Sequence, residues 1–296
     1  MVIEMKKLKW IPPSYMEECL HSGKLERLNY ETEDYFHKGR RIEKHAWVYV
    51  PYGYEKGEMY PSVYFMHGAA TDLDSFLWPA GQHFLFFHIL NHMIENGDIP
   101  PLIMIFPTYY QGEYGPSNCT KETDLALAAC FPDELRYELI PEVEKAYMDV
   151  AADYSLRNRT ERKRRIFTGF SMGGVIAWNV FCDGLDLFSS FGMLSGDCWK
   201  KEWMGGSKYP EETADILERA VKNRNYHADD FSVFAYTGEK DPAYTGMSRQ
   251  IEQLYQRKDL FSRENLSFHV MENGLHHYDY GFLYLYHCLK EWKERG

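Results

Sequence analysis

Short apolar runs alternate with longer amphipathic stretches along most of this chain of 296 residues. The runs are rich in Val, Ile, Phe and Tyr and have the length of strands, whereas the stretches repeat their apolar positions at helical spacing. The strand-like runs are 46–50, 62–66, 102–106, 165–169, 191–194, 231–236 and 266–270. The helix-like stretches are 84–95, 132–147, 175–181, 211–221, 247–257 and 280–292.

This alternation predicts an α/β protein with a mostly parallel central sheet and helices on both faces. We expect a single domain over 26–296, preceded by an N-terminal extension (1–25) packed on the body. The long stretch 198–230 between two predicted strands is interpreted as a lid-like insertion. In such sheets ligands bind where the carboxyl ends of the strands meet the loops.

A serine motif follows one of the predicted strands. Residues 169–174 read Gly-Phe-Ser-Met-Gly-Gly, which matches G-x-S-x-G, and a helix-forming run comes directly after it. A nucleophile on a tight strand-to-helix turn needs neighbours without side chains, and the turn lifts its hydroxyl above the sheet. The motif in this context predicts the α/β-hydrolase fold with Ser171 as the nucleophile.

A second loop, His67-Gly68-Ala69-Ala70, follows an earlier strand at the place where this fold carries its oxyanion hole. Backbone N–H groups there stabilise the negative charge that develops on the carbonyl oxygen of an ester. The expected donors are the amides of Ala69 and of Met172, the residue after the serine. We expect the His67 side chain to be structural.

The acid and the base should follow the serine in that order. Asp241, in the turn after the run 231–236, is the favoured acid, with Glu239 and Asp197 as competitors at strand ends. After the last predicted strand come His276 and His277, and position alone leaves open which of the two is the base.

Composition narrows the choice of partners and cofactors. The net charge of −11 gives no basic footprint for nucleic acid, and no apolar stretch has the roughly 20 residues needed to span a bilayer. The first residues lack a signal peptide's apolar core, so we expect a cytoplasmic protein, or a secreted one if the chain is a module or mature form of a longer protein. The six cysteines include no C-x-x-C pair, so no metal or organic cofactor is expected.

Taken together, these residues resemble the feruloyl esterase and acetyl-xylan esterase group of carbohydrate esterases, which is related to the esterase D family. The likeness runs from about residue 41 to the C-terminus and implies Ser171, Asp241 and His276, rather than His277, as the triad. It also implies the amides of Ala69 and Met172 as oxyanion donors. The His-Gly-Ala-Ala loop lacks a second glycine often seen in the group, and 115–131 resembles an insertion. The matching segments are 48–54, 64–68, 139–144, 169–174 and 274–276.

The resemblance implies a serine carboxylesterase that hydrolyses hydroxycinnamoyl (feruloyl) esters of plant cell-wall arabinoxylan through an acyl-enzyme. Such a substrate, small or oligosaccharide-linked, needs an apolar slot for its ring. The segment 199–204 is the candidate lid, with the pair Gly205-Gly206 as its hinge. The aromatic candidates for substrate contact are Trp199, Trp203, Tyr109, Tyr110 and Tyr244.

Several other functions stay open. An acetyl-xylan or general acyl esterase, including an S-formylglutathione hydrolase-like enzyme, would use the same triad. A siderophore trilactone esterase would want cations near the pocket, and Lys200, Lys201 and Lys208 are available. An acyltransferase would need an acceptor site that excludes water. The most remote alternative is a non-catalytic carbohydrate-binding module on the same fold.

Overall fold

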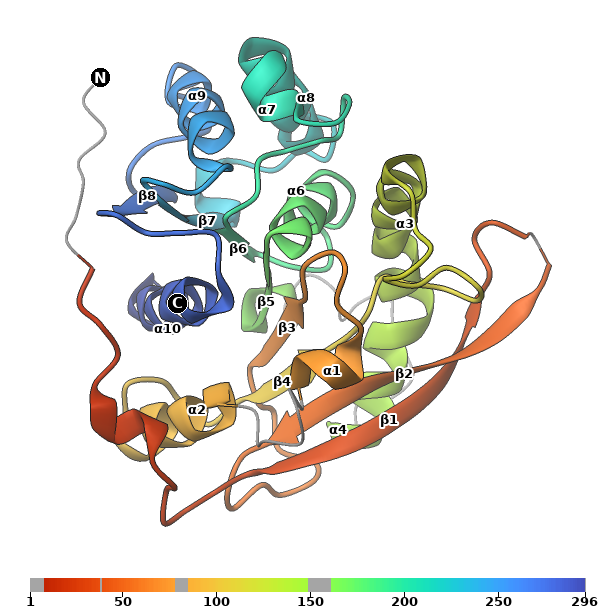
Figure 1. Ribbon diagram of the computed structural model, residues 1–296, viewed down its shortest axis with the longest axis vertical. Helices are drawn as coiled ribbons and strands as arrows, with labels where there is room; N and C mark the ends of the chain where they lie inside the picture. Colours follow the sequence, from red (N-terminus) through yellow and green to blue (C-terminus); the bar gives the residue numbers. More distant parts are fainter. Residues whose placement is uncertain (1–7, 38, 78–84, 149–160, 296) are drawn as a thin grey trace.

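The computed structural model describes residues 8–37, 39–77, 85–148 and 161–295, which fold around one eight-stranded sheet (Figure 1). The strand order is β1-β2-β4-β3-β5-β6-β7-β8. β2 runs antiparallel to both of its neighbours, and every other pair is parallel. The strands are β1 Lys24–Glu33, β2 Arg41–Val50, β3 Ser62–Met66, β4 Ile103–Phe106, β5 Arg165–Phe170, β6 Ser190–Leu194, β7 Ser232–Gly238 and β8 Leu266–Met271.

Helices cover both faces of this sheet, which confirms the predicted architecture (Figure 1). One face carries α3 Lys121–Glu134, a π-helical turn η3 Leu135–Leu139, α4 Ile140–Tyr147, α6 Met172–Asp183, α8 Pro210–Lys222 and α9 Tyr244–Leu254. The other face carries α1 Leu73–Leu77, α2 Leu85–Glu95 and α10 Tyr278–Arg295. The remaining short elements are η1 Pro13–Met16, η4 Arg162–Arg164, α7 Gly205–Lys208 and η5 Ala228–Asp230.

The central strands are apolar throughout because both of their faces are buried. In β3, Val63 and Phe65 belong to the core beneath α2 and α10, whereas Tyr64 and Met66 belong to the core beneath α6. A strand of this kind shows a continuous apolar run in the sequence, which is why β3 was predicted with its observed bounds.

β1 was not predicted from the sequence, because it is a sheet edge with a mostly polar composition. It pairs with β2 in an unbroken antiparallel register from Lys24 opposite Val50 to Glu33 opposite Arg41. The predicted boundary between residues 25 and 26 therefore falls inside this strand. The preceding residues pack on α2 and α10: Tyr15 stacks on the His92 ring of α2, and Trp10 contacts the Tyr280 ring of α10. The division into an extension and a single domain stays a prediction.

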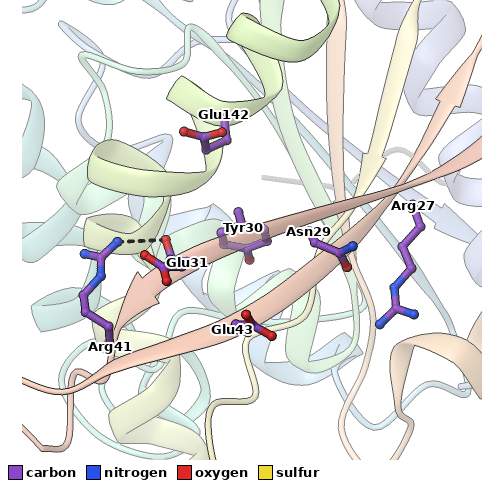
Figure 2. Close-up of a pocket in the computed structure, with 7 residues that line it drawn as sticks. All are labelled: Arg27, Asn29, Tyr30, Glu31, Arg41, Glu43 and Glu142. Atoms are coloured by element: carbon purple, nitrogen blue, oxygen red, sulfur yellow. Dashed lines mark hydrogen bonds between the residues drawn. The ribbon is translucent and has the colours of Figure 1, made fainter.

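A polar groove of about 630 Å³ lies along β1 and β2 (Figure 2). Its charged side chains have both signs, and Arg41 donates to the backbone oxygen of Glu31 at 3.1 Å. Charged side chains along an exposed edge strand prevent it from pairing with another chain. This role explains the polar lining of the groove, so no bound ligand needs to be invoked. Its lining residues are Arg27, Asn29, Tyr30, Glu31, Arg41, Glu43 and Glu142.

The helix predicted at 132–147 begins earlier, at Lys121, with the Thr120 hydroxyl accepting from the Thr123 N–H at its N-terminus. Pro132 lies inside α3. Because proline lacks an N–H, it is common at the first position of a helix, and the sequence therefore suggested a helix start at this residue. Much of the apparent insertion 115–131 is thus the first part of this helix. The predicted helix 84–95 corresponds to α2, and Phe84 lies outside the described residues.

None of the helices within the described ranges has the length and apolar character needed to cross a membrane. All six cysteines lie within those ranges as free thiols.

Candidate active site

Ser171 occupies the sharp turn between β5 and α6, with φ 59° and ψ −119°. Positive φ strains a non-glycine residue, and such strain is retained only where the surroundings fix it. The surroundings here are very close: a Cβ on Gly169 would lie 2.6 Å from the Gly173 oxygen, and one on Gly173 would lie 2.1 Å from the Met66 oxygen. The G-x-S-x-G spacing therefore follows from the contact between this turn and β3.

His276, in the loop after β8, lies over the serine. Its Nε2 is 2.7 Å from the Ser171 Oγ, and its Nδ1 is 2.9 Å from each carboxylate oxygen of Asp241. Asp241 is buried and also accepts from the Ala243 N–H at 2.8 Å. A proton on Nδ1, donated to Asp241, leaves the Nε2 lone pair to accept from the serine hydroxyl. The Phe170 ring stacks on the imidazole, with ring centroids 4.9 Å apart.

The competing residues from the sequence lie elsewhere. His277 is exposed and pairs with Asp279 at 3.1 Å. Glu239 is exposed and accepts from the Asn273 N–H at 3.0 Å. Asp197 is buried, where it accepts from the Trp199 Nε1 at 2.7 Å, and burial raises its pKa. None of the three lies within hydrogen-bonding distance of the described side chains of Ser171 and His276.

The loop that carries Ala69 is held on both sides of that residue. The Gly68 N–H donates to the Tyr278 hydroxyl at 2.8 Å, and the Ala70 N–H donates to the Tyr110 hydroxyl at 3.1 Å. The Ala69 N–H between them donates to none of the described residues. The same is true of Met172, the first residue of α6, as expected of a helix start. Ala69 and Met172 both line the cavity that contains Ser171.

His67, at the start of this loop, is fully buried and structural, as its environment indicates. Its Nε2 is 2.9 Å from the Thr108 Oγ1, and its Nδ1 is 2.7 Å from the Gly68 oxygen. Burial lowers the pKa of His67 to about 4. The ring is therefore neutral at pH 7, with Nδ1–H donating to the Gly68 carbonyl and Nε2 accepting from the Thr108 hydroxyl.

A buried ion pair supports the same region from behind. Lys44 of β2 donates to the Thr108 backbone oxygen at 2.8 Å and pairs with Glu134 at 2.7 Å. Glu134 also accepts from the Tyr30 hydroxyl at 2.6 Å and from the Gln111 amide at 2.8 Å. The sequence did not indicate this network, because a lysine in a strand near the sheet edge and a glutamate in a helix usually occupy exposed positions.

The cavity beside Ser171 has a volume of about 510 Å³ and is bordered by two of the predicted tryptophans. Trp199 and Trp203 lie in the loop after β6, with ring centroids 5.6 Å apart and planes at 65°. The Lys121 ammonium lies 3.2 Å above the Trp203 ring. The other lining residues are Ala69, Asp124, Met172, Val175, Ser195, Gly196, Asp197, Met204, Pro242, Ala243 and His276.

The three tyrosines predicted as substrate contacts do not line this cavity, so that prediction is corrected. Tyr109 is fully buried, and its hydroxyl donates to Asp124 at 3.1 Å. Tyr110 is buried and holds Ala70, and Tyr244 is the first residue of α9. Tyr109 and Tyr110 were misassigned because a loop after a strand can pass beneath the site as well as border it.

Asp124 is a wall residue that sequence reasoning missed, because it lies in the segment interpreted as an insertion. Its carboxylate is half-buried, lines the cavity and accepts from the Tyr109 hydroxyl. Burial raises the pKa of Asp124. It provides a polar group in a cavity whose walls are otherwise largely apolar.

Only part of the predicted lid borders the cavity. Residues 198–204 form the loop that carries both tryptophans, whereas Leu217 and Val221 are buried in the core, where α8 packs on α6 and α9. The predicted hinge is also corrected, because Gly205 and Gly206 lie buried in α7. A Cβ on Gly206 would lie 2.5 Å from the Gln250 Oε1, so these glycines permit close packing.

The serine turn, the histidine after the last strand and the mostly parallel sheet together define a hydrolase of the α/β-hydrolase class. Residues 41–295 match the Esterase family model, and the chain belongs to this family of carboxylic ester hydrolases. The predicted fold and the predicted esterase class are thereby confirmed.

Two curated relatives and one solved structure are also similar to this chain. The chain is 31% identical over 284 residues to endo-1,4-beta-xylanase Y of Acetivibrio thermocellus, covering 94% of this chain and 24% of that protein. It is 28% identical over 215 residues to an endo-1,4-beta-xylanase/feruloyl esterase of Xylanibacter ruminicola, covering 70% and 24%. The chain thus spans about a quarter of the length of these relatives. A feruloyl esterase module from Clostridium thermocellum, solved with sinapinate, superposes with a TM-score of 0.79 at 28% identity over 98% of this chain and 95% of that one.

Proposed function

We propose that this chain is a feruloyl esterase that uses Ser171 as nucleophile, His276 as general base and Asp241 as the orienting acid. The observation that carries the proposal is the cavity of about 510 Å³ that joins the Ser171 and His276 side chains to two tryptophans. A slot of this size exceeds what an acetyl group fills and suits a planar aromatic acid.

The reaction proceeds in two steps on these residues. His276 Nε2 takes the Ser171 proton as Oγ attacks the ester carbonyl, and the amides of Ala69 and Met172 stabilise the oxyanion. The imidazolium then gives its proton to the leaving alcohol, which breaks the ester bond and leaves an acyl-serine. Water, deprotonated by His276, hydrolyses that intermediate and releases the acid. Asp241 holds the imidazole tautomer throughout.

The walls of the cavity suggest how the acid is recognised. Trp199, Trp203 and Met204 offer apolar surface to a cinnamoyl ring, and Asp124 offers an acceptor to a phenolic hydroxyl. The names of the relatives support this choice, because one is a xylanase/feruloyl esterase and a structural neighbour was solved with sinapinate. A sugar ester in the plant cell wall would place the reaction outside the cell.

The alternatives receive less support from the site. The lysines that kept a siderophore trilactone esterase open are ion-paired: Lys200 with Asp183, Lys201 with Glu212, and Lys208 with Glu202. To pair with these three lysines, an anionic chelate would have to displace their carboxylates. An acetyl-xylan esterase or an S-formylglutathione hydrolase needs the same triad, but nothing in the two-tryptophan wall favours either.

A matched pair of assays tests the proposal, with methyl ferulate and a simple acetyl ester at equal enzyme concentration and pH. We expect a higher kcat/KM for ferulate and a loss of about 10⁶-fold in kcat for Ser171→Ala. Circular dichroism and Tm of the variant check that it is folded. Preference for the acetyl ester would keep the triad and refute the aromatic slot, whereas undiminished hydrolysis by Ser171→Ala would refute the nucleophile.

A further inference from the structure

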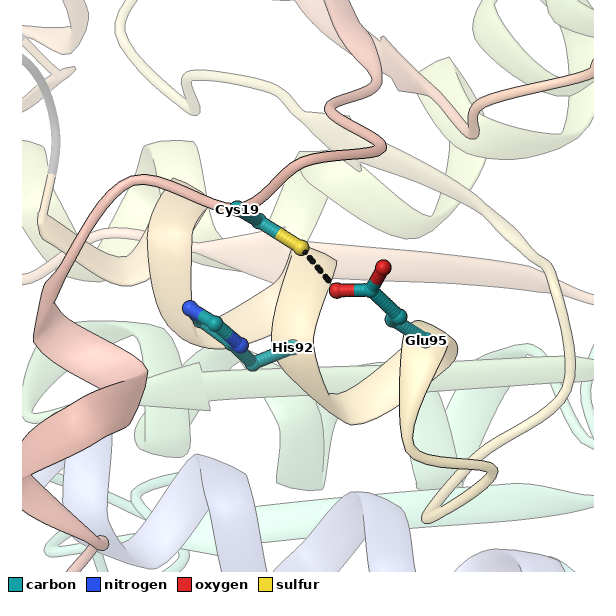
Figure 3. Close-up of side chains that lie close together, drawn as sticks. All are labelled: Cys19, His92 and Glu95. Atoms are coloured by element: carbon teal, nitrogen blue, oxygen red, sulfur yellow. Dashed lines mark hydrogen bonds between the residues drawn. The ribbon is translucent and has the colours of Figure 1, made fainter.

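A cluster of metal-ligating side chains lies on the face of the sheet that α2 covers, outside the cavity (Figure 3). Cys19, His92 and Glu95 each present a ligand atom, and these atoms all lie within 4.8 Å of one another. We propose that these three side chains bind one Zn²⁺ ion, which ties the segment between η1 and β1 to helix α2.

The ligands are brought together by two elements that are already packed on each other. His92 and Glu95 are three residues apart on α2, so their side chains lie on one face of the helix. Cys19 comes from the segment before β1, and its thiol lies 2.7 Å from Glu95 Oε2. The Gly23 N–H fixes that segment by donating to Asn91 of α2 at 2.9 Å. The two elements that carry the ligands are thus already held together, and on binding the ion would replace the thiol proton between Cys19 and Glu95.

The two histidines near the cluster have the partners that a metal site requires. His92 Nε2–H donates to the Glu17 carbonyl at 3.2 Å, and the ring stacks on Tyr15. An imidazole protonated at Nε2 carries a lone pair at Nδ1, and a backbone acceptor for the other ring nitrogen is the usual partner of a metal-bound histidine. His21 Nδ1 lies 2.9 Å from Glu95 Oε1, so it orients the carboxylate as an outer partner.

The type of ion follows from the ligands. Thiolate, imidazole and carboxylate together suit Zn²⁺, whereas Mg²⁺ and Ca²⁺ prefer oxygen ligands alone. Three protein ligands leave the fourth tetrahedral position for a solvent molecule. The thiol must lose its proton to solvent on binding, so affinity rises with pH. A C-x-x-C pair is absent from the sequence, but these ligands are a single cysteine and an H-x-x-E pair on a helix.

The site is separate from the proposed esterase chemistry. The N-terminal segment and α2 pack in the core with α10, whereas the cavity is walled by the loop after β6 and the start of α3. Binding to the folded chain alone would stabilise it by mass action. The proposal can therefore be tested through stability and stoichiometry, whatever the substrate of Ser171.

The test titrates the full chain, freed of metal by a chelator, with Zn²⁺ under calorimetry and then measures Tm. We expect one ion per chain and a higher Tm in its presence. Cys19→Ser and His92→Gln should lose more affinity than the roughly 10–100-fold that removing an outer partner costs, which is the loss expected for His21→Ala. Cys130→Ser removes a half-buried thiol outside the site and is the matched control. It should bind Zn²⁺ as tightly as the unaltered chain does.

Co²⁺ supplies a second readout that does not depend on stability. In the unaltered chain we expect a thiolate-to-cobalt absorption band, which Cys19→Ser should lose while Cys130→Ser retains it. No stoichiometric binding by the unaltered chain would overturn the proposal, as would equal binding by Cys19→Ser and His92→Gln. Methyl ferulate hydrolysis by the metal-free chain, followed in parallel, reports on the esterase proposal separately.

Discussion

The two sides of the cavity are built in different ways. On the Ser171 side, each group is fixed by a short backbone or side-chain contact: the serine turn against β3, Ala69 between two tyrosine hydroxyls, and His276 on buried Asp241. On the opposing wall, Trp203 and Asp124 come from a loop and a helix start that are far apart in the sequence. They meet through side chains, with Lys121 above the Trp203 ring.

The difference separates chemistry from selectivity. Groups that move protons must be held in hydrogen-bonding geometry, so a shift on the Ser171 side should abolish turnover. The tryptophan wall contacts the acyl group through apolar area and one carboxylate, so changes there should alter which ester is preferred while turnover persists.

The adjacent histidines provide the sharpest test of the Ser171 side. His276→Ala should lower kcat for methyl ferulate by about 10⁶-fold, because the serine loses its proton acceptor. His277→Ala should change kcat/KM by no more than about twofold, because that side chain is exposed and pairs only with Asp279 among the described residues. Steady-state kinetics on the two purified variants measures both effects.

The two histidine variants also control for each other, since each removes one imidazole from the same loop. Tm and circular dichroism should be nearly equal for the pair. If His277→Ala silences the enzyme and His276→Ala leaves it active, the assignment of the base is wrong, and the chemistry would then depend on a loop conformation other than the one described.

Asp124 tests the opposing wall. Asp124→Asn should lower kcat/KM for methyl ferulate about tenfold relative to methyl cinnamate, which lacks the phenolic hydroxyl, because one hydrogen bond to a charged acceptor is lost. Asp133→Asn, at an exposed position of the same helix, is the matched control. Equal losses on both esters would contradict a role in selectivity and would indicate that Asp124 only anchors Tyr109.

The same division explains how much the sequence revealed. The serine turn, the Ala69 loop and the buried strands are local patterns, each set by a backbone requirement that can be read over a few residues. Asp124 could not be found in this way, because it reaches the cavity only through the packing of α3 on α6. The strand β1 was missed for a similar reason: its pairing with β2 compensates for a polar sequence.

Tyr109 and Tyr110 are the opposite case, because the sequence placed them at the cavity and the structure buries them beneath it. Their place after a strand suggested contact with substrate, but one hydroxyl holds Asp124 and the other holds the Ala70 amide. Whether an aromatic side chain borders a cavity or lies beneath it depends on neighbouring elements, which a single sequence does not specify.

His67 tests the support behind the oxyanion loop, through an effect on stability rather than on turnover. Its pKa in the folded chain is about 4, below the ordinary 6.5, because the charged ring cannot be solvated. The unfolded chain therefore binds this proton more readily, so the contribution of His67 to stability is fully present above pH 6.5 and declines as the pH falls to 4. A shift of this size corresponds to a loss on the order of 3 kcal/mol across that window.

Urea unfolding of the unaltered chain and of His67→Gln, at several pH values between 4 and 7, isolates this contribution. Groups common to both chains cancel in the difference, so the free energy of unfolding should fall more steeply with decreasing pH in the unaltered chain. The glutamine amide of the variant cannot be protonated in this range. Parallel pH profiles would mean that His67 accepts a proton in place, and the loop beside Ala69 would then tolerate a buried positive charge next to the oxyanion donors.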